Sequence, residues 1–173
     1  MNSALRGNYT LNNGDTLTLV QVTDAHLMAA RGGRLLNVDT DDSLAAVLEL
    51  VEARPEPPDA LLITGDIAGD GAGDAYQRFA QALEAIPAPS FWLPGNHDSR
   101  EDMAAVLAGS TCMSAEVRIA QWQIIMLDSQ IPGHVGGELG AEQLSFLDSA
   151  LQQATASTLS VQQASSRYEQ RLD

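Results

Sequence analysis

Three short apolar runs, each ending in polar side chains, constrain the fold of this chain more than any other feature. The runs are TLTLVQVTDAH at 16–26, DALLITGD at 59–66 and SFWLPGNHD at 90–98. Their β-branched and aromatic residues are typical of buried strands, and the gaps between them are long enough for helices. We therefore predict three strands that alternate with helices.

The two gaps have the apolar period of amphipathic helices. Apolar residues stand at i, i+3, i+4 and i+7 in each gap, at Leu44, Val47, Leu48 and Val51 and at Tyr76, Phe79, Ala80 and Leu83. We expect both stripes to lie in the core. Alternating strands and helices predict parallel strands with right-handed crossovers and helices on the sheet. The fold class is therefore α/β, or a layered relative of it.

A second group of elements follows the third run. AEVRIAQWQIIMLDSQ at 115–130 predicts two more strands, with a hairpin around 120–123. GAEQLSFLDSALQQ at 140–153 predicts a helix whose core side carries Leu144, Leu147 and Leu151.

The character of the sequence changes at Ala154. The remaining residues are crowded with Ser, Thr and Gln, and the only strand-like piece, TLSV at 158–161, is interrupted by a serine. We expect one domain over 16–153 and an atypical tail over 154–173.

The formal net charge of −14 limits the classes of ligand. Only nine Lys and Arg residues are present and they are scattered, whereas nucleic-acid binding needs clustered positive charge. Nucleic acid is therefore not expected as a partner. If the ligand is a phosphate, a bound metal ion is the simplest source of local positive charge.

Cysteine content and hydropathy point to one compartment. A single cysteine, Cys112, excludes an internal disulfide and fits a reducing environment. The N-terminal stretch does not resemble a signal peptide, and no run approaches the roughly 18 apolar residues of a membrane span. We expect a cytoplasmic protein with no membrane partner, and the oligomeric state stays open.

Candidate ligands follow each of the three apolar runs, namely Asp24 and His26, Asp66, and Asn96 with His97. In open α/β sheets, ligands bind outside the carboxyl ends of the strands, so these side chains are expected to converge. Asp24 and His26 share a face if the first strand continues past them. Gly65 lets the backbone turn sharply before Asp66.

The donor types predict a divalent metal site. Carboxylate, imidazole and amide groups together suit Mn²⁺, Fe²⁺ or Zn²⁺ better than a thiolate site does. A carboxylate can also bridge two ions, which supports a metal pair acting on a phosphoryl group.

The blocks DAH, GD and GNHD, in this order and at these intervals, resemble the first three blocks of the calcineurin-like metallophosphoesterases. The finer resemblance is to bacterial class III cyclic-nucleotide phosphodiesterases, which hydrolyse 3′,5′-cyclic AMP. It depends on QVTDAHL, LLITGDIAGDG, FWLPGNHD and IIMLDSQIPGHVGGELGAEQLSFL, and it covers roughly 16–153. The resemblance implies a layered sheet sandwich with flanking helices.

The resemblance also implies a site with two divalent ions, Fe²⁺ or Mn²⁺ first and Zn²⁺ as an alternative. Asp24, His26 and Asp66 would hold the first ion. Asp66 would bridge to a second ion bound by Asn96. His26, Asn96 and His97 would contact the phosphodiester, and His97 would supply a proton or hydrogen bond to the leaving oxygen. A water activated by both ions would attack phosphorus and yield the 5′-monophosphate.

Other polar residues have structural interpretations. Asp98 with Glu101, and Ser99 with Asp102, form capping boxes for a helix that begins near Arg100. Asp98 is therefore left out of the catalytic set, although it is also a candidate to orient His97.

Three further residues lie in loops or at a helix start. Asp70 and Asp74, in GDGAGD, fit a turn and a helix N-terminus better than a metal site. His134, in IPGHVGG, is expected to be exposed, with substrate contact as the alternative.

Part of the family pattern is missing. Family members supply further histidines from a His-rich strand end and a Gly-His-x-His segment, whereas the three histidines here are His26, His97 and His134. The second ion would then have too few protein ligands, and the sheet would keep an apolar, unpaired edge. We expect a C-terminally truncated domain that is weakened or inactive, and a frameshift is one hypothesis for its tail.

Two rival functions stay open. The metal ligands do not define the leaving group, so another phosphodiester is an alternative substrate. The other rival is a non-catalytic remnant that binds metal, or a partner through the exposed sheet edge.

Overall fold

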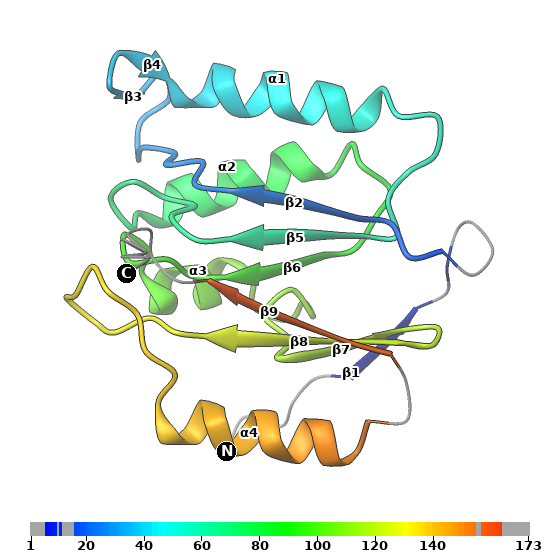
Figure 1. Cartoon of the computed structure of the whole chain (residues 1–173). Helices are drawn as coiled ribbons and strands as arrows, with labels where there is room; N and C mark the ends of the chain where they lie inside the picture. The colour runs from blue at the N-terminus through cyan, green and yellow to red at the C-terminus, as the bar shows by residue number, and fades with distance from the viewer. Residues whose placement is uncertain (1–5, 10, 12–15, 155–156, 164–173) are drawn as a thin grey trace, which may run out of the picture.

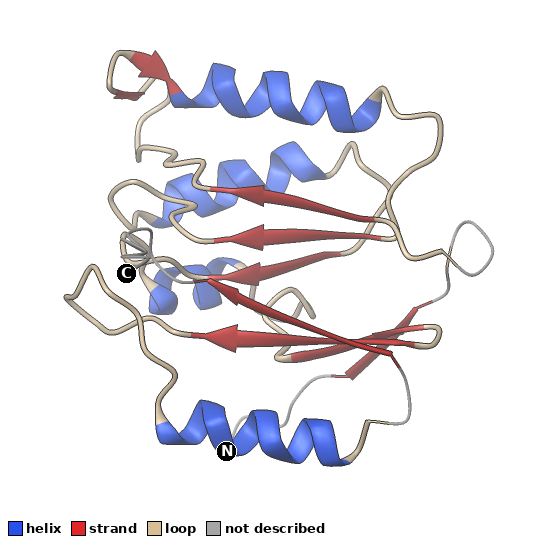
Figure 2. Ribbon diagram, in the orientation of Figure 1, coloured by secondary structure: helices blue, strands red, loops and turns tan. Residues whose placement is uncertain are grey.

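The computed structural model describes residues 6–9, 11, 16–154 and 157–163, which form two main sheets with helices on their outer faces and a small two-stranded sheet of β3 and β4 (Figures 1 and 2). The first sheet has three parallel strands in the order β2-β5-β6. These are the three predicted runs, and their bounds are Leu19–Thr23, Ala60–Thr64 and Ser90–Leu93.

Helices α1 (Thr40–Glu52) and α2 (Gly73–Leu83) cover the outer face of this sheet, as the α/β prediction requires (Figure 1). Leu61 and Ile63 of β5 are fully buried against them. The helical stripes were predicted correctly except at Val47, which is 42% exposed. Val47 lies beside the buried stripe of α1 because the helical period of 3.6 residues rotates it out of the core.

The second sheet has the order β1-β7-β8-β9. β7 and β8 form the predicted antiparallel hairpin, with Ala120 in its turn at φ +47°. β1 pairs in parallel with β7 and was not predicted from the sequence. The bounds of the four strands are Arg6–Tyr9, Glu116–Ile119, Trp122–Asp128 and Ser157–Gln163.

Strand β9 corrects one expectation about the tail. It pairs in parallel with β8 from Trp122 opposite Ser157 to Asp128 opposite Gln163. The strand-like piece TLSV therefore lies in a strand, and the expected unpaired edge of the sheet is not at β8. A backbone ladder of this length forms without an apolar sequence pattern because its hydrogen bonds use only main-chain groups.

The two sheets face each other and enclose an apolar layer. Alternation along β5 sends Leu61 and Ile63 to the helices, and Ala60 and Leu62 to the second sheet. In the second sheet, Val117, Ile119, Ile124 and Met126 complete this layer. The layered sandwich implied by the sequence is confirmed.

Helix α4 (Ala141–Gln152) covers the other face of the second sheet. Ala150, Phe146 and Leu147 pack on this face, whereas Leu144 and Leu151 are about half exposed at 51% and 47%. Of the three leucines predicted for the core side, Leu147 packs on the sheet, and the other two lie partly in solvent.

The carboxyl ends of β2, β5, β6 and β8 lie along the same edge of the molecule (left in Figure 1). Short elements lie near this edge, namely β3 (Arg34–Leu35), β4 (Val38–Asp39) and α3 (Arg100–Val106). Among the described residues, no helix combines the length and apolarity needed to cross a membrane.

Candidate metal centre

The loops that follow β2 and β5 stay paired beyond the strands. The Asp24 N–H donates to the Gly65 carbonyl at 3.1 Å, and the His26 N–H donates to the Asp66 carbonyl at 2.8 Å. Asp24, His26 and Asp66 have φ values of +56°, +47° and +42°. The first strand therefore turns at these residues, and the expectation of a continuing strand face was wrong. Left-handed backbone at non-glycine residues is costly and is typical of functional sites.

This turn gathers the three side chains. One potential ligand atom from each of Asp24, His26 and Asp66 lies within 4.8 Å of the other two. His26 Nε2 is 3.8 Å from Asp66 Oδ2, and the Thr23 hydroxyl donates to Asp24 Oδ2 at 2.5 Å. Two carboxylates and one imidazole fit a divalent first-row ion in charge and in donor type. Asp66 is buried and Asp24 is exposed, so the cluster opens at the surface.

The loop after β6 packs directly against Asp66. A Cβ at Gly95 would lie 2.2 Å from the Asp66 nitrogen and 2.3 Å from Asp66 Oδ1, so only glycine fits there. The His97 N–H donates to the same Oδ1 at 3.0 Å. Asn96, between these two contacts, is therefore held beside Asp66.

His97 lies next to the cluster. Its ring is exposed and sits 5.3 Å from the His26 ring in an edge-to-face arrangement. His97 Nδ1 is 3.1 Å from the Gly69 carbonyl oxygen. A proton on Nδ1 donates to that carbonyl, which leaves Nε2 for a ligand. The structure thus brings Asp24, His26, Asp66 and the His97 ring together and places the backbone of Asn96 next to Asp66, while their chemical roles remain predictions.

Comparison with known proteins agrees with this geometry. The family profile named calcineurin-like phosphoesterase matches residues 17–134. The chain belongs to this family.

Three relatives indicate where in the family it lies. The chain is 43% identical over 140 residues to a 3′,5′-cyclic adenosine monophosphate phosphodiesterase CpdA of Pseudomonas aeruginosa. It is 41% identical over 138 residues to that of Escherichia coli (strain K12), and 36% identical over 137 residues to a 3′,5′-cyclic-nucleotide phosphodiesterase of Nostoc sp.. These matches cover 80%, 79% and 78% of this chain but 51%, 50% and 51% of the relatives. The chain spans about half the length of the curated relatives it matches.

Asp98 ends the GNHD block of this calcineurin-like chain, and its carboxylate faces the backbone of two loops. It accepts from the N–H groups of Ile67 at 3.1 Å, Ala68 at 2.9 Å and Gly95 at 2.7 Å. The Tyr76 hydroxyl also donates to it at 3.0 Å. Burial raises the pKa of Asp98, and these hydrogen bonds oppose the shift. Asp98 therefore ties the β5 loop to the β6 loop.

This arrangement corrects both sequence-based roles of Asp98. Helix α3 is capped by Ser99, whose side chain accepts from the Asp102 N–H at 3.2 Å, and not by Asp98. The His97 ring nitrogen Nδ1 is hydrogen-bonded to the Gly69 carbonyl, whereas the Asp98 carboxylate is hydrogen-bonded to backbone N–H groups and to the Tyr76 hydroxyl. The Tyr76 oxygen in turn accepts from the Ser99 N–H, and burial together with the nearby Asp98 carboxylate raises the pKa of Tyr76.

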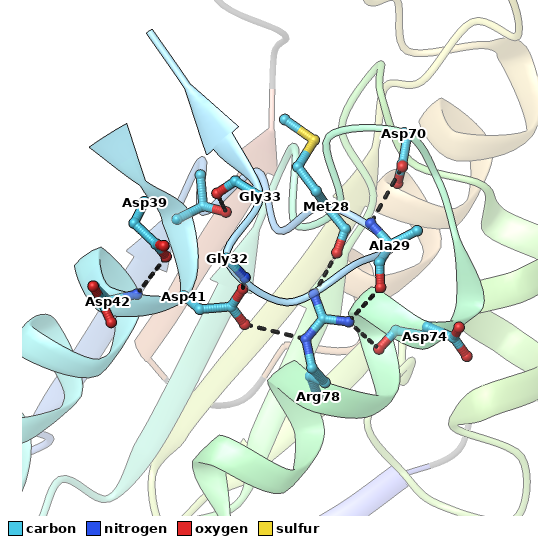
Figure 3. Close-up of polar contacts among 11 residues, drawn as sticks. Met28, Ala29, Gly32, Gly33, Asp39, Asp41, Asp42, Asp70, Asp74 and Arg78 are labelled. Atoms are coloured by element: carbon cyan, nitrogen blue, oxygen red, sulfur yellow. Dashed lines mark hydrogen bonds and ion pairs between the residues drawn. The ribbon is translucent and has the colours of Figure 1, made fainter. Parts of the chain in front are cut away.

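Arg78 on α2 fastens the loop that follows the first candidate ligands (Figure 3). Its guanidinium donates to the carbonyls of Met28 and Ala29, the latter at 2.7 Å, and to Asp41 Oδ1 at 3.1 Å. The Asp70 carboxylate accepts from the Ala29 N–H at 3.2 Å. Arg78 was not predicted from the sequence, because an arginine on a helix is usually a surface residue.

Asp70 and Asp74 lie in the turn and at the helix start predicted for them. Asp70 also accepts from the Ala72 N–H at 3.4 Å within its turn, and Asp74 lies in the first turn of α2. His134 is exposed, as expected.

Proposed function

We propose that this chain supplies the metal-binding rim of a phosphodiesterase that hydrolyses 3′,5′-cyclic AMP to the 5′-monophosphate. The observation that carries the proposal is the cluster of Asp24, His26 and Asp66, whose ligand atoms lie within 4.8 Å of one another. The names of the relatives support a cyclic nucleotide as the substrate class. The proposal concerns residues 16–153, and β9 extends the second sheet beside β8.

Each ligand has a distinct task in this proposal. Asp24, His26 and Asp66 would bind the first divalent ion, and Asp66 and Asn96 would bind a second. When bound, such ions lower the pKa of water and neutralise charge on phosphoryl oxygens. Fe²⁺ or Mn²⁺ suits this mixed oxygen and nitrogen set, with Zn²⁺ as the alternative. Local positive charge is needed because the chain as a whole carries a formal charge of −14.

His97 is the proposed proton donor. Hydrolysis to the 5′-monophosphate breaks the bond between phosphorus and O3′, and the departing oxygen must gain a proton. With Nδ1 directed at the Gly69 carbonyl, a protonated Nε2 of His97 can give that proton. His26, whose ring lies 5.3 Å from that of His97, and Asn96, the residue before His97, would contact the phosphoryl oxygens.

A rival function is supported by one specific observation. Among the described residues, Asp24, His26 and Asp66 form the one group of at least three His, Cys, Asp or Glu ligands close enough to share an ion, so a protein that binds one ion without catalysis is the second candidate.

Calorimetry and product analysis test the proposal. The chain is titrated with Mn²⁺ and then assayed for 5′-AMP formation from 3′,5′-cyclic AMP, with 2′,3′-cyclic AMP and bis(4-nitrophenyl) phosphate as comparison substrates. Two ions with 5′-AMP formation support the proposal, whereas turnover of only the comparison substrates assigns another phosphodiester. One bound ion and no turnover favours the metal-binding protein, and no bound ion refutes both functions.

A further inference from the structure

One side chain from the second sheet reaches the loop that carries Asn96 and His97. β8 ends at Asp128, at the edge where the candidate ligands lie, and Ser129 and Gln130 follow it. The Gln130 side-chain amide donates to the Gly95 carbonyl at 2.6 Å and to the Asp98 carbonyl at 2.8 Å. These two acceptors are the residues immediately before and after Asn96 and His97, so one amide group spans the loop.

The two contacts use both protons of the amide. A primary amide nitrogen has two N–H donors and no capacity to accept, so it can satisfy two carbonyl oxygens at once. Two N–H groups of the same loop donate to carboxylates, Gly95 to Asp98 Oδ2 and His97 to Asp66 Oδ1. The Asp98 N–H also donates to the Gly95 carbonyl at 3.3 Å, so Gln130 gives this carbonyl a second donor and supplies one to the Asp98 carbonyl.

Gln130 is itself held in place. Its N–H donates to Asp128 Oδ1 at 2.8 Å, and Asp128 is ion-paired with Arg100 at the start of α3. The backbone at Gln130 also bridges to Gly137, and the Glu138 N–H donates to the Ser129 carbonyl at 2.9 Å. The backbone that carries the Gln130 side chain is thus held by hydrogen bonds on both sides.

We propose that Gln130 is a positioning residue that fixes Asn96 and His97 against Asp66 and thereby sets the geometry of the second metal position. This inference rests on the proposed function for its metal-binding consequence, whereas its structural part concerns the loop alone. Residues that orient metal ligands typically affect affinity although they do not touch the ion.

The test replaces the amide donor while keeping the side-chain shape. Gln130→Glu turns the two donors into acceptors that face two carbonyls. Gln143→Glu is the matched control, because Gln143 Oε1 accepts from the Asp128 N–H and a glutamate keeps that acceptor while adding the same charge. Gln130→Leu removes the donors without adding charge, and so keeps the test valid if the glutamate variant folds poorly.

The first readout is hydrogen exchange of the His97 amide in the metal-free chain. Loss of two hydrogen bonds is expected to speed this exchange about tenfold in both Gln130 variants, with no change in Gln143→Glu or in the amides of β5. An unchanged His97 rate in a folded Gln130 variant overturns the inference.

The second readout is Mn²⁺ affinity by calorimetry. The Gln130 variants are expected to bind Mn²⁺ about tenfold more weakly than the wild-type chain, and Gln143→Glu is expected to match the wild type. Faster exchange with unchanged Mn²⁺ affinity overturns the link between the loop and the metal. If the wild-type chain binds no Mn²⁺, the proposed function fails, and the exchange rates still decide whether Gln130 holds the loop.

Discussion

The two sheets contribute to the same edge of the molecule in different ways. All candidate ligands follow strands of the β2-β5-β6 sheet, where β5 is buried along its full length. The β1-β7-β8-β9 sheet contributes Gln130 and the ion pair of Asp128 with Arg100, all of which contact the loop after β6 or the helix that follows it. One sheet thus carries the candidate ligands and the other supports them.

This division has a physical reason. Ligand side chains must lie within a few ångströms of one another, which parallel neighbouring strands achieve because their carboxyl ends meet. The loop carrying Asn96 and His97 follows β6, which is an edge strand of its sheet among the described strands. This loop therefore has a neighbouring strand of the same sheet on one side only. Support on that side comes from the second sheet through Gln130.

The strongest test of this comparison removes the central carboxylate. Asp66→Asn is expected to weaken Mn²⁺ binding at least 100-fold, about 3 kcal/mol, because Asp66 is the proposed shared ligand and a buried amide cannot replace its charge. Calorimetry measures the affinity. Asp59→Asn is the matched control at the opposite end of β5, where Asp59 Oδ2 accepts from the Thr18 N–H and an amide oxygen can still accept. An equal loss of Mn²⁺ affinity in both variants would mean that Asp66 affects metal binding only through the stability of the fold.

Gly95→Ala tests how closely the two loops of the first sheet must approach. A Cβ there would lie 2.2 Å from the Asp66 nitrogen, and the overlap is expected to cost about 2 kcal/mol of unfolding free energy and to weaken Mn²⁺ binding. Urea unfolding and calorimetry measure the two effects. Gly140→Ala serves as the control because a Cβ at Gly140 meets no atom within 4 Å. A Gly95→Ala protein with wild-type stability would show that the loops can separate freely.

Arg78→Lys tests the helix side of the first sheet. A lysine cannot match the planar fork that reaches two loop carbonyls and Asp41, so the variant is expected to lose about 1 kcal/mol of unfolding free energy. Thermal unfolding measures the loss. The exposed Arg54 provides the matched control as Arg54→Lys, which is expected to leave stability unchanged. No difference between the two variants would remove Arg78 from the support of this edge.

The sequence predicted the ligand cluster well because its signal is local and repeated. Each of three apolar runs ends in a ligand-type residue, and the α/β topology brings parallel strand ends to one edge. Asp24, His26 and Asp66 meet as expected, although they meet through left-handed turns that no sequence period indicates.

The supporting contacts were not predictable in the same way. Asp98 fits a helix cap by sequence, and only its distance to Ile67 and Ala68, about thirty positions earlier, shows that it ties two loops together. Gln130 and β9 depend on partners that are equally far away in sequence. Local patterns therefore identified the groups with chemistry, whereas the residues that hold them required the three-dimensional structure.

His134→Ala tests whether support from the second sheet reaches beyond Gln130 into the exposed loop that follows it. His134 is exposed, and its backbone N–H donates to the Ile131 carbonyl at 3.0 Å, a contact that alanine keeps. The variant is therefore expected to change unfolding free energy by less than about 0.5 kcal/mol and to leave Mn²⁺ affinity unchanged. Urea unfolding and calorimetry measure both quantities for His134→Ala and for Gln130→Glu, so the two variants of one loop are compared directly. A loss of Mn²⁺ affinity in His134→Ala would show that the second sheet contributes a group to the site itself, and the division between reactive and supporting sheets would no longer hold.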